Sequence, residues 1–198
     1  GAEIVISSFT RSFFEEEETA WVASARAGNV VGGGDWSEFR LIPDCVRSLR
    51  DEVPVKLRSP QATRPWQFVL EPLAGYLLLG KRLAEEGKVF QGAWNFGPPV
   101  DNTKTVEHGA QATVEAWGEG TIERLPTAPF HESMLLQLDS TKARRYLGWR
   151  SVVDFSETMQ LTTDWYKHQH TSGDASMREY SMSQLDAFEE LLNREVSL

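Results

Sequence analysis

The sequence has 198 residues, of which 40% are hydrophobic, a composition that excludes intrinsic disorder and suits a globular protein. Its 29 acidic and 20 basic residues give a net charge of −9, which argues against broad nucleic-acid binding because such binding depends on Lys and Arg. Because Cys45 is the single cysteine, an intrachain disulfide and a Cys-rich zinc site are excluded. The sequence contains neither a long apolar run nor a signal peptide, so we expect a cytoplasmic protein that does not enter a membrane.

The first part of the chain alternates helical and extended patterns. Apolar residues at helical spacing predict a helix over 3–14, followed by an acidic run over 15–18 that we expect to be a solvated loop rather than a metal site. A short apolar run over 21–31, closed by three glycines, predicts a buried strand. A helix over 41–50 and a strand over 53–57 follow. The cysteine lies in the apolar stripe of that helix and is expected to be buried.

The rest of the chain continues this alternation. The expected elements are helices over 72–86, 105–117, 141–147 and 155–168, strands over 93–97 and 121–125, a loop over 127–138, a break at 170–174 and a tail helix over 183–193. Strands that alternate with helices make α/β the predicted fold class.

A glycine-rich segment over 28–34 has the composition of a dinucleotide loop but not its spacing. A Rossmann fingerprint needs Gly-x-Gly-x-x-Gly between a strand and a helix, so that pyrophosphate meets the helix N-terminus. Here the spacing differs, and Asp35 and Glu38 place carboxylates where phosphate would lie. We expect instead a turn that brings Asn29 to the mouth of a cleft, at the C-terminal end of a parallel strand.

Arg64 is the strongest candidate for an anion contact, because it follows a polar turn and presents a planar donor fork that suits phosphate oxygens. An exposed or salt-bridged arginine is the alternative from this segment alone. Glu132, beside His131 in a segment without helical periodicity, could accept hydrogen bonds from ribose hydroxyls, with an ordinary surface pair as its alternative. The other histidines show no zinc-ligand spacing, and no Ser-His-Asp or Cys-His arrangement stands out.

Several motifs together resemble CDP-glucose 4,6-dehydratases, from Gly1 to about His168. The segments that carry the resemblance are Arg26-Ala27-Gly28-Asn29-Val30-Val31-Gly32-Gly33-Gly34-Asp35-Trp36, Arg40-Leu41-Ile42-Pro43-Asp44, Ala62-Thr63-Arg64-Pro65-Trp66-Gln67, Leu70-Glu71-Pro72, Trp94-Asn95-Phe96-Gly97-Pro98, His131-Glu132, Leu138-Asp139-Ser140, Lys142-Ala143 and Leu147-Gly148-Trp149. The triple glycine followed by Asp-Trp, and Thr-Arg-Pro-Trp-Gln, distinguish this pattern from the more general epimerases and dehydratases of the extended short-chain dehydrogenase/reductase superfamily.

The resemblance implies the C-terminal part of an extended short-chain dehydrogenase fold, with the last Rossmann strands and a small substrate-binding domain interleaved over 1–168 and a tail over 169–198. It implies an NAD-dependent internal redox cycle that eliminates water from a sugar nucleotide. The glycine loop for NAD, the Tyr-x-x-x-Lys pair and the acid/base pair would lie upstream of Gly1, so we expect the chain alone to be inactive. The full-length enzyme is expected to be a homo-oligomer. The superfamily commonly dimerises through the helix that bears the catalytic Tyr and Lys, and residues 3–14 would be the remnant of that helix.

The resemblance also assigns substrate contacts. The residues concerned are Asn29 near the sugar or diphosphate, Leu41, Ile42 and Pro43 around the base, Arg64 on the diphosphate, Glu132 near the ribose, and Trp66 and Gln67 shaping the same pocket. The sequence departs from the pattern at Phe68, where His is more usual, and at Ser151, where Pro is common. Two alternatives stay open: another NAD-dependent sugar-nucleotide epimerase or dehydratase, and a stand-alone nucleotide-sugar-binding module without catalysis.

Overall fold

The computed structural model describes residues 1–14, 20–126 and 137–196. Its helices are α1 (Ala2–Phe13), α2 (Leu41–Arg50), α3 (Leu70–Glu86), α4 (Val106–Trp117), α5 (Phe155–Ser172) and α6 (Met177–Val196). Its strands are β1 (Ala23–Ala27), β2 (Asn29–Val31), β3 (Val55–Leu57), β4 (Thr63–Phe68), β5 (Gly92–Phe96), β6 (Thr103–Thr105) and β7 (Ile122–Arg124). Short 3-10 helices are η1 (Gly87–Phe90), η2 (Val100–Asn102) and η4 (Asp174–Ser176), and η3 (Ala143–Leu147) is a short π-helix.

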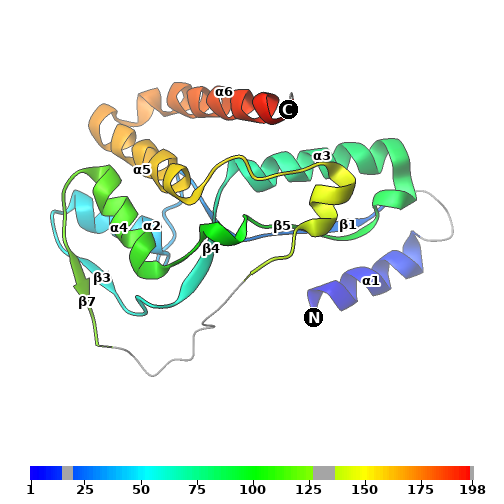
Figure 1. Cartoon of the computed structure of the whole chain (residues 1–198), viewed down its shortest axis with the longest axis horizontal. Helices are drawn as coiled ribbons and strands as arrows, with labels where there is room; N and C mark the ends of the chain where they lie inside the picture. The colour runs from blue at the N-terminus through cyan, green and yellow to red at the C-terminus, as the bar shows by residue number, and fades with distance from the viewer. Residues whose placement is uncertain (15–19, 127–136, 197–198) are drawn as a thin grey trace.

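In the described part of the chain the strands form three small sheets. β1 pairs with β5 and β3 pairs with β7, both in parallel. The second half of β4 pairs in parallel with β2, and its first half pairs with the antiparallel β6. Figure 1 shows β1 and β5 beside α3 and α1 at one end, and β3 and β7 beside α2 and α4 at the other. Parallel pairs joined through helices are the pattern of an α/β protein, as predicted.

The single buried strand predicted over 21–31 is wrong in two respects. The segment is two strands, because the N–H of Gly28 donates to the side-chain Oε1 of Gln67 at 3.1 Å and the chain then changes sheets. A side chain at Gly28 would be impossible without rearrangement, since a Cβ there would lie 2.7 Å from the carbonyl oxygen of Pro65. Neither strand is fully buried, and Ala25 and Arg26 are exposed.

The main hydrophobic core lies between α2, α4 and α5. Helix α2 has the predicted bounds, and its apolar stripe buries Ile42, Cys45, Val46 and Leu49. Cys45 is completely buried, as predicted, and burial raises the pKa of its thiol to about 12. The thiol therefore stays protonated and packs as a small hydrophobe.

A second core joins α3 to β5 and η3. Gly75 allows the close approach, since a Cβ at that position would lie 2.3 Å from the ring of Phe96. The rings of Phe96 and Trp149 meet edge to face at 5.3 Å. Beside them, the buried carboxylate of Glu71 accepts hydrogen bonds from the Ser151 hydroxyl at 2.8 Å and from the N–H of Val152 at 2.7 Å and of Val153 at 2.9 Å. These hydrogen bonds hold the segment after η3 against the start of α3.

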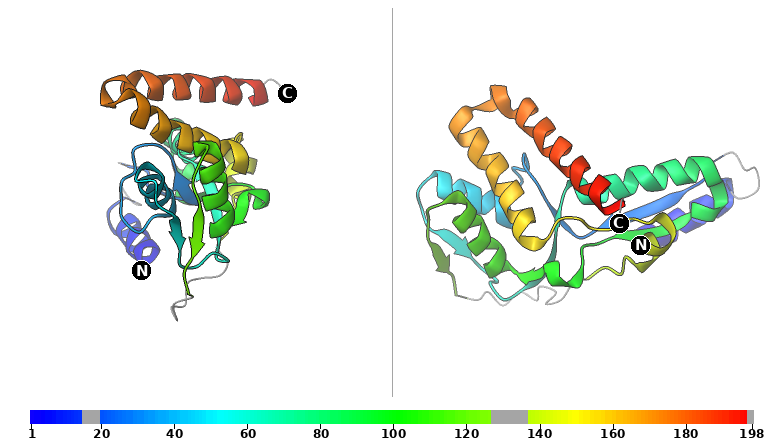
Figure 2. Two further views of the ribbon diagram at one scale, coloured as in Figure 1. Left: turned by 90° about the vertical axis from the view of Figure 1, so that its left-hand side faces the viewer. Right: turned by 45° about the horizontal axis from the view of Figure 1, so that its top comes forward.

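The C-terminal helices are longer than the sequence predicts. α5 continues to Ser172 and ends at Gly173, whose φ of +75° no side chain adopts easily, so the chain breaks there rather than over 170–174. α6 begins at Met177 rather than at 183. The two helices form a hairpin (Figure 2). Contacts with α5 hold the additional part of α6, since the Trp165 Nε1 donates to the Ser181 hydroxyl at 2.9 Å and the His168 and Tyr180 rings stack at 4.2 Å. In the described residues no helix combines the length and apolarity needed to cross a bilayer.

Candidate functional site

A cavity of about 460 Å³ lies between the β2–β4 strands, the start of α2 and strand β3. Its lining residues are Asn29, Val30, Val31, Asp35, Phe39, Arg40, Leu41, Ile42, Pro43, Asp44, Lys56, Leu57, Arg58, Ser59, Arg64, Trp66 and Val106. A cavity of this size is typical of small-molecule sites. Six of the eight residues predicted to contact substrate are among them, from three separate segments of the chain.

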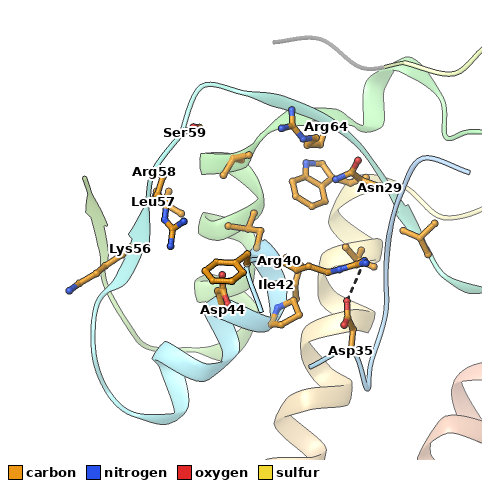
Figure 3. Close-up of a pocket in the computed structure, with 17 residues that line it drawn as sticks. Asn29, Asp35, Arg40, Ile42, Asp44, Lys56, Leu57, Arg58, Ser59 and Arg64 are labelled. Carbon is orange, nitrogen blue, oxygen red and sulfur yellow. Dashed lines mark ion pairs between the residues drawn. The ribbon is translucent and has the colours of Figure 1, made fainter. Parts of the chain in front are cut away.

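Asn29 and Arg64 occupy one end of the cavity (Figure 3). Parallel pairing places them together, because Asn29 on β2 is in register with Trp66 on β4, two residues beyond Arg64. The Arg64 Nη1 donates to the carbonyl oxygen of Thr63 at 2.8 Å, and the Trp66 Nε1 donates to that of Lys104 at 3.2 Å. The turn after β1 thus brings Asn29 to a cleft, as the sequence predicts.

The first turn of α2 forms an apolar wall of the cavity. Leu41, Ile42 and Pro43 all line it, and Ile42 is buried. Pro43 is tolerated here because the N–H groups of a first helical turn have no partner within the helix. Trp66 is buried across from them. Together these side chains offer a surface suited to a flat, weakly polar group.

Basic side chains that the sequence reading did not single out also line the cavity. They are Arg40, which precedes α2, Lys56 on β3, and Arg58, which directly follows β3. The two acidic side chains of the lining are both paired, Asp35 with Arg40 at 3.7 Å and Asp44 with Arg47. Desolvation raises the pKa of Asp35, but hydrogen bonds from Ser37 and the nearby arginines outweigh it, and the net pKa is lowered. The cavity is therefore locally basic in an acidic chain.

The glycine-rich segment packs closely against the rest of the fold. A Cβ at Gly33 would lie 2.0 Å from the Trp165 ring, so this backbone rests directly on α5. The Tyr166 hydroxyl donates to the carbonyl oxygen of Asp35 at 2.6 Å and of Gly32 at 3.2 Å, and burial raises the pKa of that phenol to about 12. Packing against Trp165 thus accounts for the glycine at position 33.

Of the two remaining predicted contacts, Gln67 does not line the cavity and Glu132 lies outside the described residues. Gln67 points to the opposite face of β4 from Trp66, because side chains alternate along a strand, and it is completely buried against Gly28. Its Nε2 has no hydrogen-bond partner among the described residues. Glu132, with His131, lies outside the described residues. Within the described ranges no cluster of three His, Cys, Asp or Glu residues could hold a metal ion.

Comparison with known proteins supports the resemblance drawn from the motifs. The chain is 43% identical over 171 residues to the CDP-glucose 4,6-dehydratase of Salmonella typhimurium, a match that covers 84% of the chain and 48% of that protein. The chain therefore spans about half the length of the curated relative that it matches. No family model matches the chain.

Solved structures share the fold at low sequence identity. The DesIV double mutant, a dTDP-glucose 4,6-dehydratase from Streptomyces venezuelae, aligns with a TM-score of 0.68 and 20% identity over 87% of the chain and 50% of its own. The UDP-glucose 4-epimerase of Stenotrophomonas maltophila aligns with a TM-score of 0.69 and 16% identity over 85% of the chain and 54% of its own. The predicted α/β class and its place within the extended short-chain dehydrogenase fold are confirmed.

Proposed function

We propose that this chain binds a nucleotide-diphosphate sugar in the cavity beside α2 and forms the substrate-binding part of a CDP-glucose 4,6-dehydratase. The observation that carries the proposal is the convergence of Asn29, the first turn of α2, Arg64 and Trp66 on one cavity. These groups come from distant parts of the sequence, and the fold brings them together. The 43% identity to the Salmonella dehydratase supports the same substrate class.

The chemistry of the cavity suits the two ends of such a ligand. The guanidinium of Arg64 can donate two parallel hydrogen bonds to phosphate oxygens, and the amide of Asn29 can donate to the same group. The apolar wall formed by Leu41 and Ile42 suits the base. The remaining basic side chains of the lining attract an anionic ligand although the chain as a whole is acidic.

The proposed reaction belongs to a longer protein than this chain. The sequence contains no Tyr-x-x-x-Lys motif, so we propose that these 198 residues bind the sugar nucleotide without converting it. The glycine-rich segment lacks the Gly-x-Gly-x-x-Gly spacing of a dinucleotide loop, so NAD chemistry is proposed only for a protein in which a dinucleotide-binding domain accompanies this chain. A lyase reaction is the corresponding proposal for that protein.

Binding can be measured by titrating the chain with CDP-glucose in a calorimeter. We expect Arg64→Ala to weaken binding roughly ten- to hundredfold, because hydrogen bonds to a charged group contribute about 1.5–3 kcal/mol. Arg64→Lys, which keeps the charge but loses the planar fork, should fall between wild type and Ala. Wild-type affinity should also decrease as salt is added.

A control variant is Arg82→Ala, which removes an exposed arginine paired with Glu86 on α3, far from the lining, and should leave affinity unchanged. Parallel titrations with UDP-glucose and dTDP-glucose separate the CDP-glucose proposal from a related epimerase or dehydratase. A folded wild-type chain that binds none of these nucleotides would contradict the proposal.

A further inference from the structure

Phe39 is an exposed aromatic residue in a backbone conformation that phenylalanine rarely adopts. It lies in the turn before α2 with φ of +64°, and 76% of its side chain is exposed. In the described residues only one other non-glycine residue, Glu52, has a positive φ. Left-handed conformations are unfavourable for residues with a bulky side chain, and they concentrate at functional sites.

The contacts of Phe39 within the fold do not explain why a phenylalanine occupies this turn. An apolar residue at this position before a helix often packs against the fourth helical residue, but here that residue is the charged Asp44. The ring of Phe39 contacts the Arg58 guanidinium, whose carbon lies 5.5 Å from the ring centre. With three quarters of the side chain in solvent, burial contributes little to stability. A turn residue such as Asn or Gly would satisfy this backbone better.

The position of Phe39 relates it to the ligand instead. Phe39 and Arg58 both line the candidate cavity, and both also line a neighbouring cavity of about 740 Å³, so the pair forms a lip between the two. Figure 3 shows Arg58 across the cavity from Arg64 and Asn29. The phosphate-binding groups and this aromatic lip are therefore at different ends of the site.

We propose that Phe39, held by Arg58, stacks on the nucleobase of the bound nucleotide. The proposal rests on the proposed function and adds to it a residue that recognises the base. An exposed ring beside a guanidinium is suited to a flat heterocycle, and stacking of a base on an aromatic side chain tolerates every base. The strained turn keeps the ring at the lip, where it remains in solvent until the ligand arrives.

Substitutions at Phe39 should therefore separate the effect on stability from the effect on binding. Phe39→Asn relieves the left-handed backbone and should raise Tm by about 2–4 °C, while it weakens binding of CDP about tenfold. Phe39→Leu keeps an apolar side chain on a strained backbone, so it should leave Tm unchanged and weaken CDP binding to a similar extent. Phe39→Trp should retain the affinity of wild type. Inorganic pyrophosphate, which has no base, should bind all four proteins equally.

Glu52→Asn is the matched control, because Glu52 has φ of +55° in an exposed turn outside the cavity lining. It should raise Tm in the same way and leave CDP affinity unchanged. Unaltered CDP affinity in Phe39→Leu and Phe39→Asn overturns the role of Phe39 while the proposed function stands. Equal losses for CDP and pyrophosphate also overturn it, because they place the residue on the phosphates. A folded wild type that does not bind CDP overturns both proposals.

Discussion

Glu71 shows how one buried side chain can organise a segment far away in sequence. Its carboxylate accepts hydrogen bonds from Ser151, Val152 and Val153, so two backbone N–H groups of the segment after η3 depend on it. Burial raises the pKa of Glu71, although these hydrogen bonds oppose the rise. The departure from the family pattern at Ser151 thus has a local reason, since a proline there could not donate the hydroxyl hydrogen bond.

The raised pKa predicts a pH dependence of stability. Between the ordinary value of 4.5 and the raised value, the folded state binds more protons than the unfolded state, so the contribution of Glu71 to the free energy of unfolding falls as pH rises through this window. Glu71→Gln, which does not titrate, should lack this component. Thermal unfolding of both proteins from pH 4 to pH 8 measures it.

In that comparison, the difference in Tm between Glu71→Gln and wild type should shift in favour of Gln as pH rises. Glu71→Ala should be destabilised throughout by about 3 kcal/mol, because the partly buried N–H of Val152 and the buried N–H of Val153 lose their acceptor. A difference between Gln and wild type that does not vary with pH would show that Glu71 has an ordinary pKa in the folded protein.

Residue-level prediction of the site depended on local sequence motifs. Asn29 and Arg64 could be predicted because each stands in a short, recognisable turn or strand. The resemblance assigns Gln67 to the same pocket as Trp66, although strand alternation places the two on opposite faces. Arg58 and Phe39 were missed because their proximity arises only when β3 folds beside the start of α2. Their local sequence carries no sign of that contact.

At the scale of elements, the boundaries of a helix could be predicted accurately where its apolar periodicity is strong. Elsewhere tertiary contacts set the boundaries, and the predicted ones differ from the observed ones. Helix α2 has the predicted bounds because its apolar stripe is unambiguous. The 21–31 segment was predicted as one strand because its composition is uniform, whereas Gly28 and Gln67 divide it. The tail helix was predicted too short, because residues near Met177 have little periodicity of their own and are held by α5.

The packing of α6 predicts that the tail contributes to the stability of the core. Phe188 is 3% exposed and meets Phe68 edge to face at 6.3 Å, in a cluster with Val153. We expect Phe188→Ala to lower the free energy of unfolding by about 3–5 kcal/mol, measured by urea denaturation. Leu77→Ala, at a side chain that is 77% exposed on α3, should cost far less. Equal, small effects would mean that α6 is not docked in solution.

At the scale of the whole molecule, charge and exposed apolar surface are unevenly distributed. The chain carries a net charge of −9, yet four basic side chains line the candidate cavity. At the other end, β1 is partly exposed and α1 buries no residue. Parallel sheets are usually covered on both faces, so this end has the character of a surface that meets another protein surface.

Helix α1 is the clearest case, because Val5, Phe9 and Phe13 recur every four residues along one face and are all more than half exposed. We predict that the chain self-associates through this face, and that Phe9→Glu combined with Phe13→Glu shifts it toward monomer. Sedimentation velocity over a range of concentrations measures the shift. Val89→Glu, at an apolar position on η1 that is even more exposed, is the control and should leave association unchanged. If wild type is monomeric at every concentration, the face is not self-complementary, and its apolar residues must meet a different surface.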